Sequence, residues 1–180
     1  MTAISSPDSF SSEQPPVYPE AARRPGAALD YFFMRRRSAA IGEQFWNAVA
    51  RGWPGFNPIE RTRWARLFSR YKSYWTPDIL PPGDRAFYDE LPEQFTAYRG
   101  QNGVELAASG SYTLSREVAQ GYALGRRNIS YSDPTILSLR VMKTHVALAF
   151  TARDEEEIVL FSAQSSNLSL EAIRAARVTH

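Results

Sequence analysis

The stretch Asp154-Glu155-Glu156-Glu157-Ile158-Val159-Leu160-Phe161 runs four acidic residues directly into four apolar ones. Its apolar half is typical of a buried strand, and successive side chains of a strand alternate between the two faces of a sheet. This alternation places Glu155 and Glu157 on one face and points Glu156 away. Two carboxylates at the end of a strand suit the binding or stabilisation of a cation, whereas a solvated loop before an edge strand is the ordinary alternative.

Composition narrows the range of functions. The 180 residues are 43% apolar, which is enough for one domain with its own core. Cysteine is absent, which excludes disulfides, thiolate nucleophiles and cysteine-bound zinc or iron–sulfur clusters. The chain has two histidines: His145 lies in an expected strand, and His180 is the last residue. Neither is well placed for a Ser-His-Asp triad or a metal site, so we expect no metal. No apolar run approaches the roughly 20 residues that span a bilayer, so we expect a soluble protein without membrane contact.

The first 25 residues are rich in Ser and Pro, and they contain neither a basic start nor an apolar stretch. This composition predicts a disordered tail over residues 1–25 and does not match a conventional secretory signal. We therefore expect the protein to be cytoplasmic, or to be delivered into a target cell without a signal peptide. Residues 26–180 are expected to form one domain, with a helical part over 26–92 and a β core over 93–180.

Charge distinguishes the helical part, since residues 23–72 hold eleven basic and three acidic residues. Helical spacing of apolar residues predicts one helix from about residue 27 to 51, with the run Arg35-Arg36-Arg37 inside it, ended by Gly52-Trp53-Pro54. A second helix is expected to open at Asn57-Pro58-Ile59-Glu60, where Asn can cap the helix and Pro suits the first helical position.

The second helix combines an apolar stripe with a basic face. Apolar residues recur at three- and four-residue steps, and basic residues fill the other positions. The stripe consists of Trp64, Leu67, Phe68, Tyr71 and Trp75. A core-packing helix with a solvated basic face is the simpler interpretation. A nucleic-acid surface is the alternative, because Lys and Arg neutralise phosphates whatever the base sequence.

Strand-like runs dominate the second half of the chain. Strands are expected at residues 94–100, 110–114, 135–142, 145–150 and 157–161, and helices at about 85–91, 115–123 and 168–176. Ser115 is expected to cap the middle one of these helices. Gly100 is expected to end its strand at a point where a ligand backbone approaches closely. Helices first and strands later predict an α+β fold with a mixed or antiparallel sheet.

Three separated pieces of this second half, in order, resemble the arginine–serine–glutamate class of ADP-ribosyltransferases. Tyr98-Arg99-Gly100 looks like the first-strand arginine of that family, and Ser111-Tyr112-Thr113 looks like its Ser-Thr-Ser strand. Glu155-Glu156-Glu157 looks like its E-x-E motif, with the second glutamate directly before an aliphatic strand. The family usually has Thr and Ser where this chain has Tyr112 and Thr113; Thr113 keeps the hydroxyl, and Tyr112 is expected to point away from the site.

The resemblance, which covers about residues 95–161, implies an ADP-ribosyltransferase-like β core with NAD as substrate. Cleavage of the nicotinamide–ribose bond has a transition state of oxocarbenium character, which a nearby carboxylate stabilises. By resemblance that carboxylate is Glu157, and Glu155 orients or deprotonates the acceptor. Arg99 would donate to the phosphate or ribose region of NAD, and Ser111 would hold the carboxylate and NAD in register. The expected NAD-binding residues are Tyr98, Arg99, Gly100, Ser111 and Thr113.

These features together predict an NAD-dependent mono-ADP-ribosyltransferase, which is a glycosyltransferase, acting on a macromolecule. A protein arginine is the expected acceptor, a toxin or effector role is expected for so small an enzyme, and an inhibitory partner is among the expected partners. Alternatives of other classes stay open, because fold similarity does not settle function. One is a protein that binds or modifies nucleic acid, and the other is a binding module of this fold that has lost catalysis.

Overall fold

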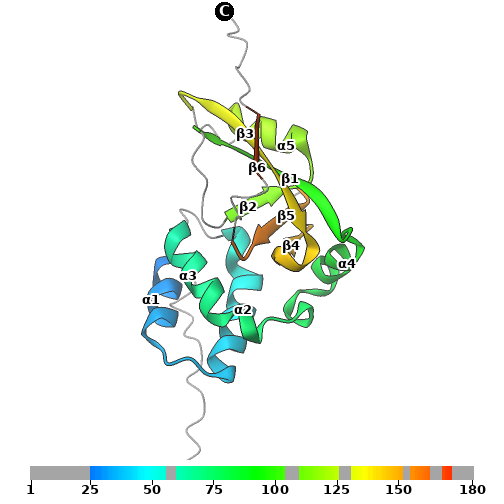
Figure 1. Cartoon of the computed structure of the whole chain (residues 1–180). Coiled ribbons are helices and arrows are strands. Elements are labelled where there is room, and N and C mark those ends of the chain that lie inside the picture. Colours follow the sequence, from blue (N-terminus) through cyan, green and yellow to red (C-terminus); the bar gives the residue numbers. More distant parts are fainter. Residues whose placement is uncertain are drawn as a thin grey trace, which may run out of the picture.

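The computed structural model describes residues 25–55, 60–103, 110–125, 131–151, 155–162 and 168–171. Within these residues, helices α1 (Pro25–Met34), α2 (Ala39–Gly52) and α3 (Arg61–Tyr71) form a group beside an antiparallel sheet (Figure 1). The predicted α+β class is therefore confirmed. Residue 25 begins α1, and the rest of the expected disordered tail lies outside the described residues.

The single helix predicted over residues 27–51 is wrong, because the chain leaves the helical path at residues 35–38. Ser38 ends this connection and caps α2, its hydroxyl accepting a hydrogen bond from the amide of Ile41. On the other side, Arg70 of α3 donates to the carbonyl oxygens of Phe33 and Arg35. The carbonyl groups at the end of α1 thus accept hydrogen bonds from outside the helix. The run Arg35-Arg36-Arg37 lies in the connection between α1 and α2.

The predicted stop after α2 is confirmed, since α2 ends at Gly52 and a 3₁₀ turn, η2 (Trp53–Gly55), follows. The expected start of the next helix at residues 57–59 lies outside the described residues, and α3 is described from Arg61. Its core-packing interpretation is confirmed, because the side chains of the stripe on α3 are fully buried. They are Trp64, Leu67, Phe68 and Tyr71. A second 3₁₀ turn, η3 (Lys72–Tyr74), places Trp75 beyond the helix, where it is half-buried.

The sheet of the described residues has six strands in the order β4-β5-β2-β1-β3-β6, and all neighbours pair antiparallel. The strands are β1 (Gln94–Asn102), β2 (Gly110–Thr113), β3 (Pro134–Met142), β4 (Val146–Phe150), β5 (Glu157–Leu160) and β6 (Leu168–Glu171). β1 and β3 pair along their whole length. Between β1 and β2 the described register is the pair Tyr98 and Thr113, so these two strands separate beyond it.

The predicted helix over residues 168–176 is wrong in its first turn, because residues 168–171 form β6 against β3. The sequence Leu168-Ser169-Leu170-Glu171 alternates apolar and polar residues, which suits a strand once β3 offers an edge to pair with. Residues 172–176 lie outside the described part. The strand predicted to begin at His145 begins one residue later, since His145 belongs to the 3₁₀ turn η5 (Lys143–His145).

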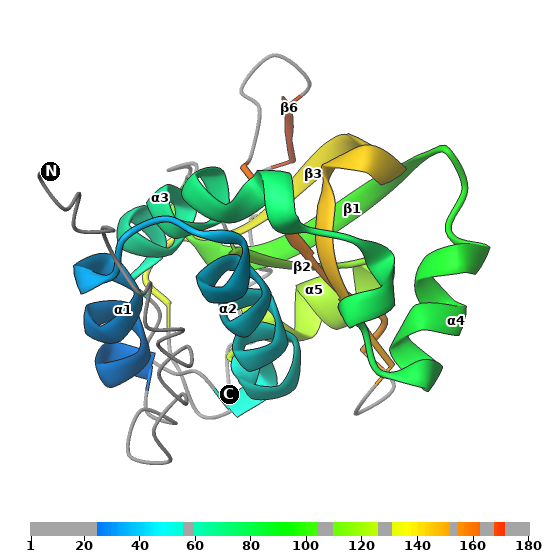
Figure 2. The same ribbon diagram turned by 90° about the horizontal axis from the view of Figure 1, so that it is seen from below.

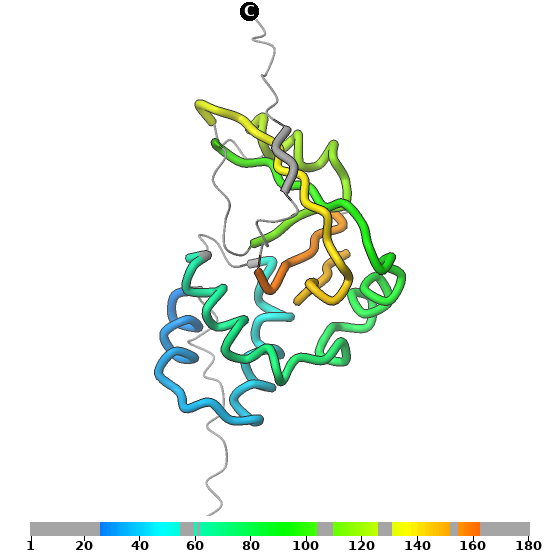
Figure 3. The backbone as a smooth tube through the Cα atoms, in the orientation of Figure 1, coloured from blue at the N-terminus to red at the C-terminus, as the bar shows by residue number. Residues whose placement is uncertain are grey.

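Helices cover the sheet from different sides. Helix α5 (Arg116–Ala123) packs against β1 and β3, and α4 (Pro82–Glu90) packs against β4. Seen from below, α1, α2 and α3 lie together in front while α5 lies behind the strands (Figure 2). The backbone trace passes from the helical group through α4 into β1 (Figure 3). The main core joins the helical group to the sheet, and rings of Trp46 and Phe161 lie 5.6 Å apart across that contact.

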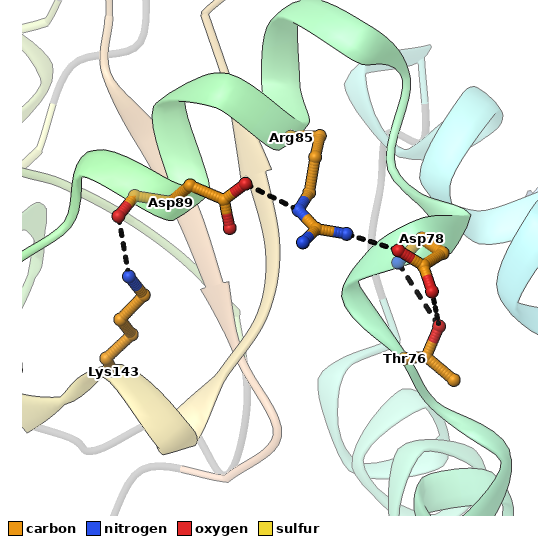
Figure 4. Close-up of polar contacts among 5 residues, drawn as sticks. All are labelled: Thr76, Asp78, Arg85, Asp89 and Lys143. Carbon is orange, nitrogen blue, oxygen red and sulfur yellow. Dashed lines mark hydrogen bonds and ion pairs between the residues drawn. The ribbon is translucent and has the colours of Figure 1, made fainter.

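A polar network on the surface ties α4 to its neighbours (Figure 4). Arg85 of α4 pairs with Asp89 of the same helix and with Asp78 of the 3₁₀ turn η4 (Pro77–Ile79). Lys143 of η5 donates to the carbonyl oxygen of Asp89. Because these groups are largely solvated, each ion pair contributes little on its own. The network connects α4 with η4 and with the β3–β4 turn.

Candidate active site

The residues that carried the family resemblance lie on three neighbouring strands. Arg99 is on β1, Ser111 is on β2 and Glu157 opens β5, and the sheet order places β2 between the other two strands. Thr113 of β2 pairs with Tyr98 on one side and with Glu157 on the other. Directly opposed residues share a face of the sheet. Tyr98, Thr113 and Glu157 therefore form one row across it.

Arg99 extends into the space where β1 and β2 separate. Its Nη1 donates to the carbonyl oxygen of Ser111 at 3.1 Å, and its guanidinium carbon lies 5.7 Å from the centre of the Tyr112 ring. A side chain at position 110 would collide with this guanidinium, so Gly110 leaves the room that Arg99 takes. Tyr112 is buried at 2% exposure and alternates with Ser111 and Thr113 along β2. Its ring therefore points off the face of those hydroxyls, as predicted, but it lies beside the Arg99 guanidinium and so not away from every predicted site residue.

Gly100 has a different role from the one predicted. The strand does not end there, since β1 continues to Asn102. A side chain at position 100 would collide with the backbone of α5, at the carbonyl oxygen of Ala119 and the amide nitrogen of Ala123. The close approach expected for a ligand backbone is therefore made by α5. The helix and strand pack this tightly because both facing positions are small, and Ala119 is fully buried.

The acidic motif turns before it enters the sheet. β5 begins at Glu157, so the expectation that Glu155 and Glu157 share a strand face by alternation is wrong. Glu156 has a φ of 42°, which is left-handed backbone, and its side chain is exposed. The carbonyl oxygen of Glu156 accepts from the amide of Leu114 at 3.3 Å. Glu157 is half-buried at the start of β5.

Glu155 is buried at 7% exposure. One carboxylate oxygen, Oε1, accepts a hydrogen bond of 2.7 Å from the phenol of Tyr122 on α5. Its backbone carbonyl accepts from the hydroxyl of Thr113, and that hydroxyl accepts from the amide of Ser115. Burial of a carboxyl group requires such donors. The contacts join the acidic turn to the segment that links β2 and α5.

Helix α5 begins as predicted. The hydroxyl of Ser115 accepts from the amide of Val118 and so caps the helix. Ser115 also donates to the carboxylate of Glu117 in the first turn. The backbone amide and this hydroxyl lower the pKa of Glu117. Both ends of the segment that carries Tyr122 are therefore fixed, by the cap at one end and by packing on Gly100 near the other.

Trp53 and Tyr122 are site neighbours that sequence reasoning missed. Trp53, in η2, donates from Nε1 to the hydroxyl of Ser111 at 3.0 Å and is 2% exposed. Its ring lies 5.5 Å from that of Trp64 and at the same distance from that of Phe68, within the helical core. In the sequence Trp53 belongs to an expected helix stop, and Tyr122 lies within the helix expected over residues 115–123. No local pattern marks either contact.

Two kinds of feature are absent from the described part of the chain. No group of three or more histidine, cysteine or acidic residues there is arranged to hold a metal ion. No helix there has the length and apolar character needed to cross a membrane. Comparisons of the chain with protein-family models, with curated proteins and with solved structures gave no match.

Proposed function

We propose that this protein is a mono-ADP-ribosyltransferase that transfers ADP-ribose from NAD to a macromolecular acceptor, a protein arginine. The observation that carries the proposal is the placement of Arg99, Ser111 and Glu157 on the neighbouring strands β1, β2 and β5. The resemblance requires these residue types to act together, although they are far apart in the sequence. That their strands are neighbours in the sheet supports it.

The position of each residue in the fold suits the role that it has in the proposal. Arg99 supplies charged donors at the gap between β1 and β2, where a planar guanidinium can bind phosphate or ribose oxygens. Glu157 places a carboxylate at the start of β5, and that charge would stabilise the oxocarbenium character of the ribose as nicotinamide leaves. The buried carboxylate of Glu155 lies two residues earlier, on the turn, and would face the acceptor.

Intramolecular contacts of the basic helical part favour this function over nucleic-acid binding. Arg63 pairs with Asp30 at 2.6 Å and with Glu60 at 3.2 Å. Arg70 is engaged with carbonyls at the end of α1, and Arg37 donates to Ser73. Arginines that hold the helices to one another have fewer donors left for phosphates.

The decisive experiment measures nicotinamide release from NAD by the purified protein, with and without a host-cell lysate. Wild type is compared with Glu157→Gln, Glu155→Gln and Glu156→Gln, the last being a matched control because Glu156 is exposed. We expect lysate-dependent turnover, label on a lysate protein, and a loss of about a hundredfold or more in Glu157→Gln. Loss of transfer in Glu155→Gln and near wild-type turnover in Glu156→Gln are also expected. A folded wild-type protein that never consumes NAD would refute the proposal.

A further inference from the structure

The acidic turn is fastened to the β2–α5 segment by hydrogen bonds from both backbone and side chains. Oε1 of Glu155 accepts from Tyr122 at 2.7 Å, and the carbonyl oxygens of Glu155 and Glu156 accept from the Thr113 hydroxyl and the Leu114 amide. The backbone contacts hold the turn. The Tyr122 contact differs, because it alone among these reaches the carboxylate that the proposed function uses.

A hydrogen bond to one carboxylate oxygen restricts how the whole group rotates. With Oε1 held by the phenol of Tyr122, the rotation of the Glu155 carboxylate is restricted, and so is the direction of its Oε2. Hydrogen bonds to an ionised acceptor are short and strong, and Glu155 is only 7% exposed, so little water competes for it. The donor is itself fixed, since α5 is capped by Ser115 and packs directly on Gly100.

We infer that Tyr122 is a positioning residue for the acceptor step, acting through Glu155; this inference rests on the proposed function. In that step a guanidinium nitrogen of the acceptor bonds to the ribose carbon that bears nicotinamide. The carbon–nitrogen bond to nicotinamide breaks, and its electron pair leaves with neutral nicotinamide. The proton lost by the guanidinium passes to Glu155 and then to solvent. Tyr122 keeps the accepting carboxylate aimed at the incoming nitrogen.

The test compares Tyr122→Phe with wild type, because phenylalanine keeps the ring and removes only the hydroxyl. Two rates are measured: transfer from NAD to agmatine, a small guanidine, and hydrolysis of NAD by water. We expect kcat for transfer to fall roughly tenfold or more, since a hydrogen bond to a charged group is lost. The KM for NAD should stay at the wild-type value, and the ratio of transfer to hydrolysis should fall. Tyr74→Phe, in η3 on the helical part, is the matched control.

A double-mutant cycle separates action through Glu155 from general loss of structure. In the Glu155→Gln background, Tyr122→Phe should cause no further loss of transfer. Equal losses of transfer and hydrolysis in Tyr122→Phe, an additive effect in the cycle, or unchanged transfer would each overturn the inference. Failure of the proposed function is seen separately, because wild type itself would then not consume NAD with agmatine or lysate. If Tyr122→Phe does not fold, Tyr122→His, which offers a ring N–H donor, replaces it and is expected to keep more transfer than Glu155→Gln.

Discussion

Replacing Gly100 with alanine tests the packing that supports Tyr122. A methyl group at position 100 meets the carbonyl oxygen of Ala119 and the amide nitrogen of Ala123, which are backbone atoms of α5. Side chains can rotate away from a new group, but a helix backbone has to shift as a whole. Overpacking a tight core costs about 1–3 kcal/mol. Because this contact is to backbone and Ala119 is fully buried, we expect Gly100→Ala to lose about 2–3 kcal/mol of unfolding free energy.

Urea unfolding followed by tryptophan fluorescence measures this loss. Gly83→Ala is the matched control, because the added methyl group in α4 meets nothing nearer than the Thr151 hydroxyl at 3.9 Å. Alanine is a better helix former than glycine, so the control should be as stable as wild type or more stable, by up to about 1 kcal/mol. Wild-type stability in Gly100→Ala would refute the packing argument. Wild-type stability together with a raised KM for NAD would restore the ligand role first expected for Gly100.

Two further predictions concern the helical part. Arg70→Met removes the donors to the carbonyls of Phe33 and Arg35 and should cost about 1–2 kcal/mol in urea unfolding, whereas the exposed Arg66→Met should change stability by less than about 0.5 kcal/mol. Burial raises the pKa of Tyr71, and the positive charges of Arg70 and Arg37 offset part of this rise. The folded state therefore keeps this proton more tightly than the unfolded state, whose pKa is about 10. The stabilisation that comes from this difference in pKa is fully present below the unfolded pKa and is lost as the pH rises through the folded pKa. Urea midpoints should thus fall more steeply between about pH 9 and 11 in wild type than in Tyr71→Phe; equal slopes would contradict the assignment.

The sequence predicted best where the pattern is local and repeated. The stripe on α3 has helical spacing over several turns, and its four members there are fully buried. The break at residues 35–38 was missed, because arginine is a good helix former and the break depends on Ser38 and on the distant Arg70. Residues 168–171 were assigned to a helix because their strand state depends on pairing with β3, which the local sequence does not display.

The candidate site shows the same limit. The motif order in the sequence predicted which strands would carry Arg99, Ser111 and Glu157, and those strands are neighbours in the sheet. The contacts to Trp53 and Tyr122 could not be predicted, because they join residues 58 and 33 positions apart. Gly100 was misread for a related reason. A glycine in a strand signals a close approach, but the approaching element is known only from the fold.

The helical part is structurally inseparable from the strands that carry the site. Trp53 holds the hydroxyl of Ser111 on β2 from within the helical core. Phe161, directly after β5, packs between the rings of Trp46 and Trp75, at 5.6 and 5.4 Å. Glu157 is the first residue of β5, and these ring contacts hold the other end of β5. The position of Glu157 therefore depends on packing against the helical part. Glu155 shares the support of Thr113 with Glu157, but its carboxylate has the further contact from α5, so changes to the helical core should disturb Glu157 before the carboxylate of Glu155.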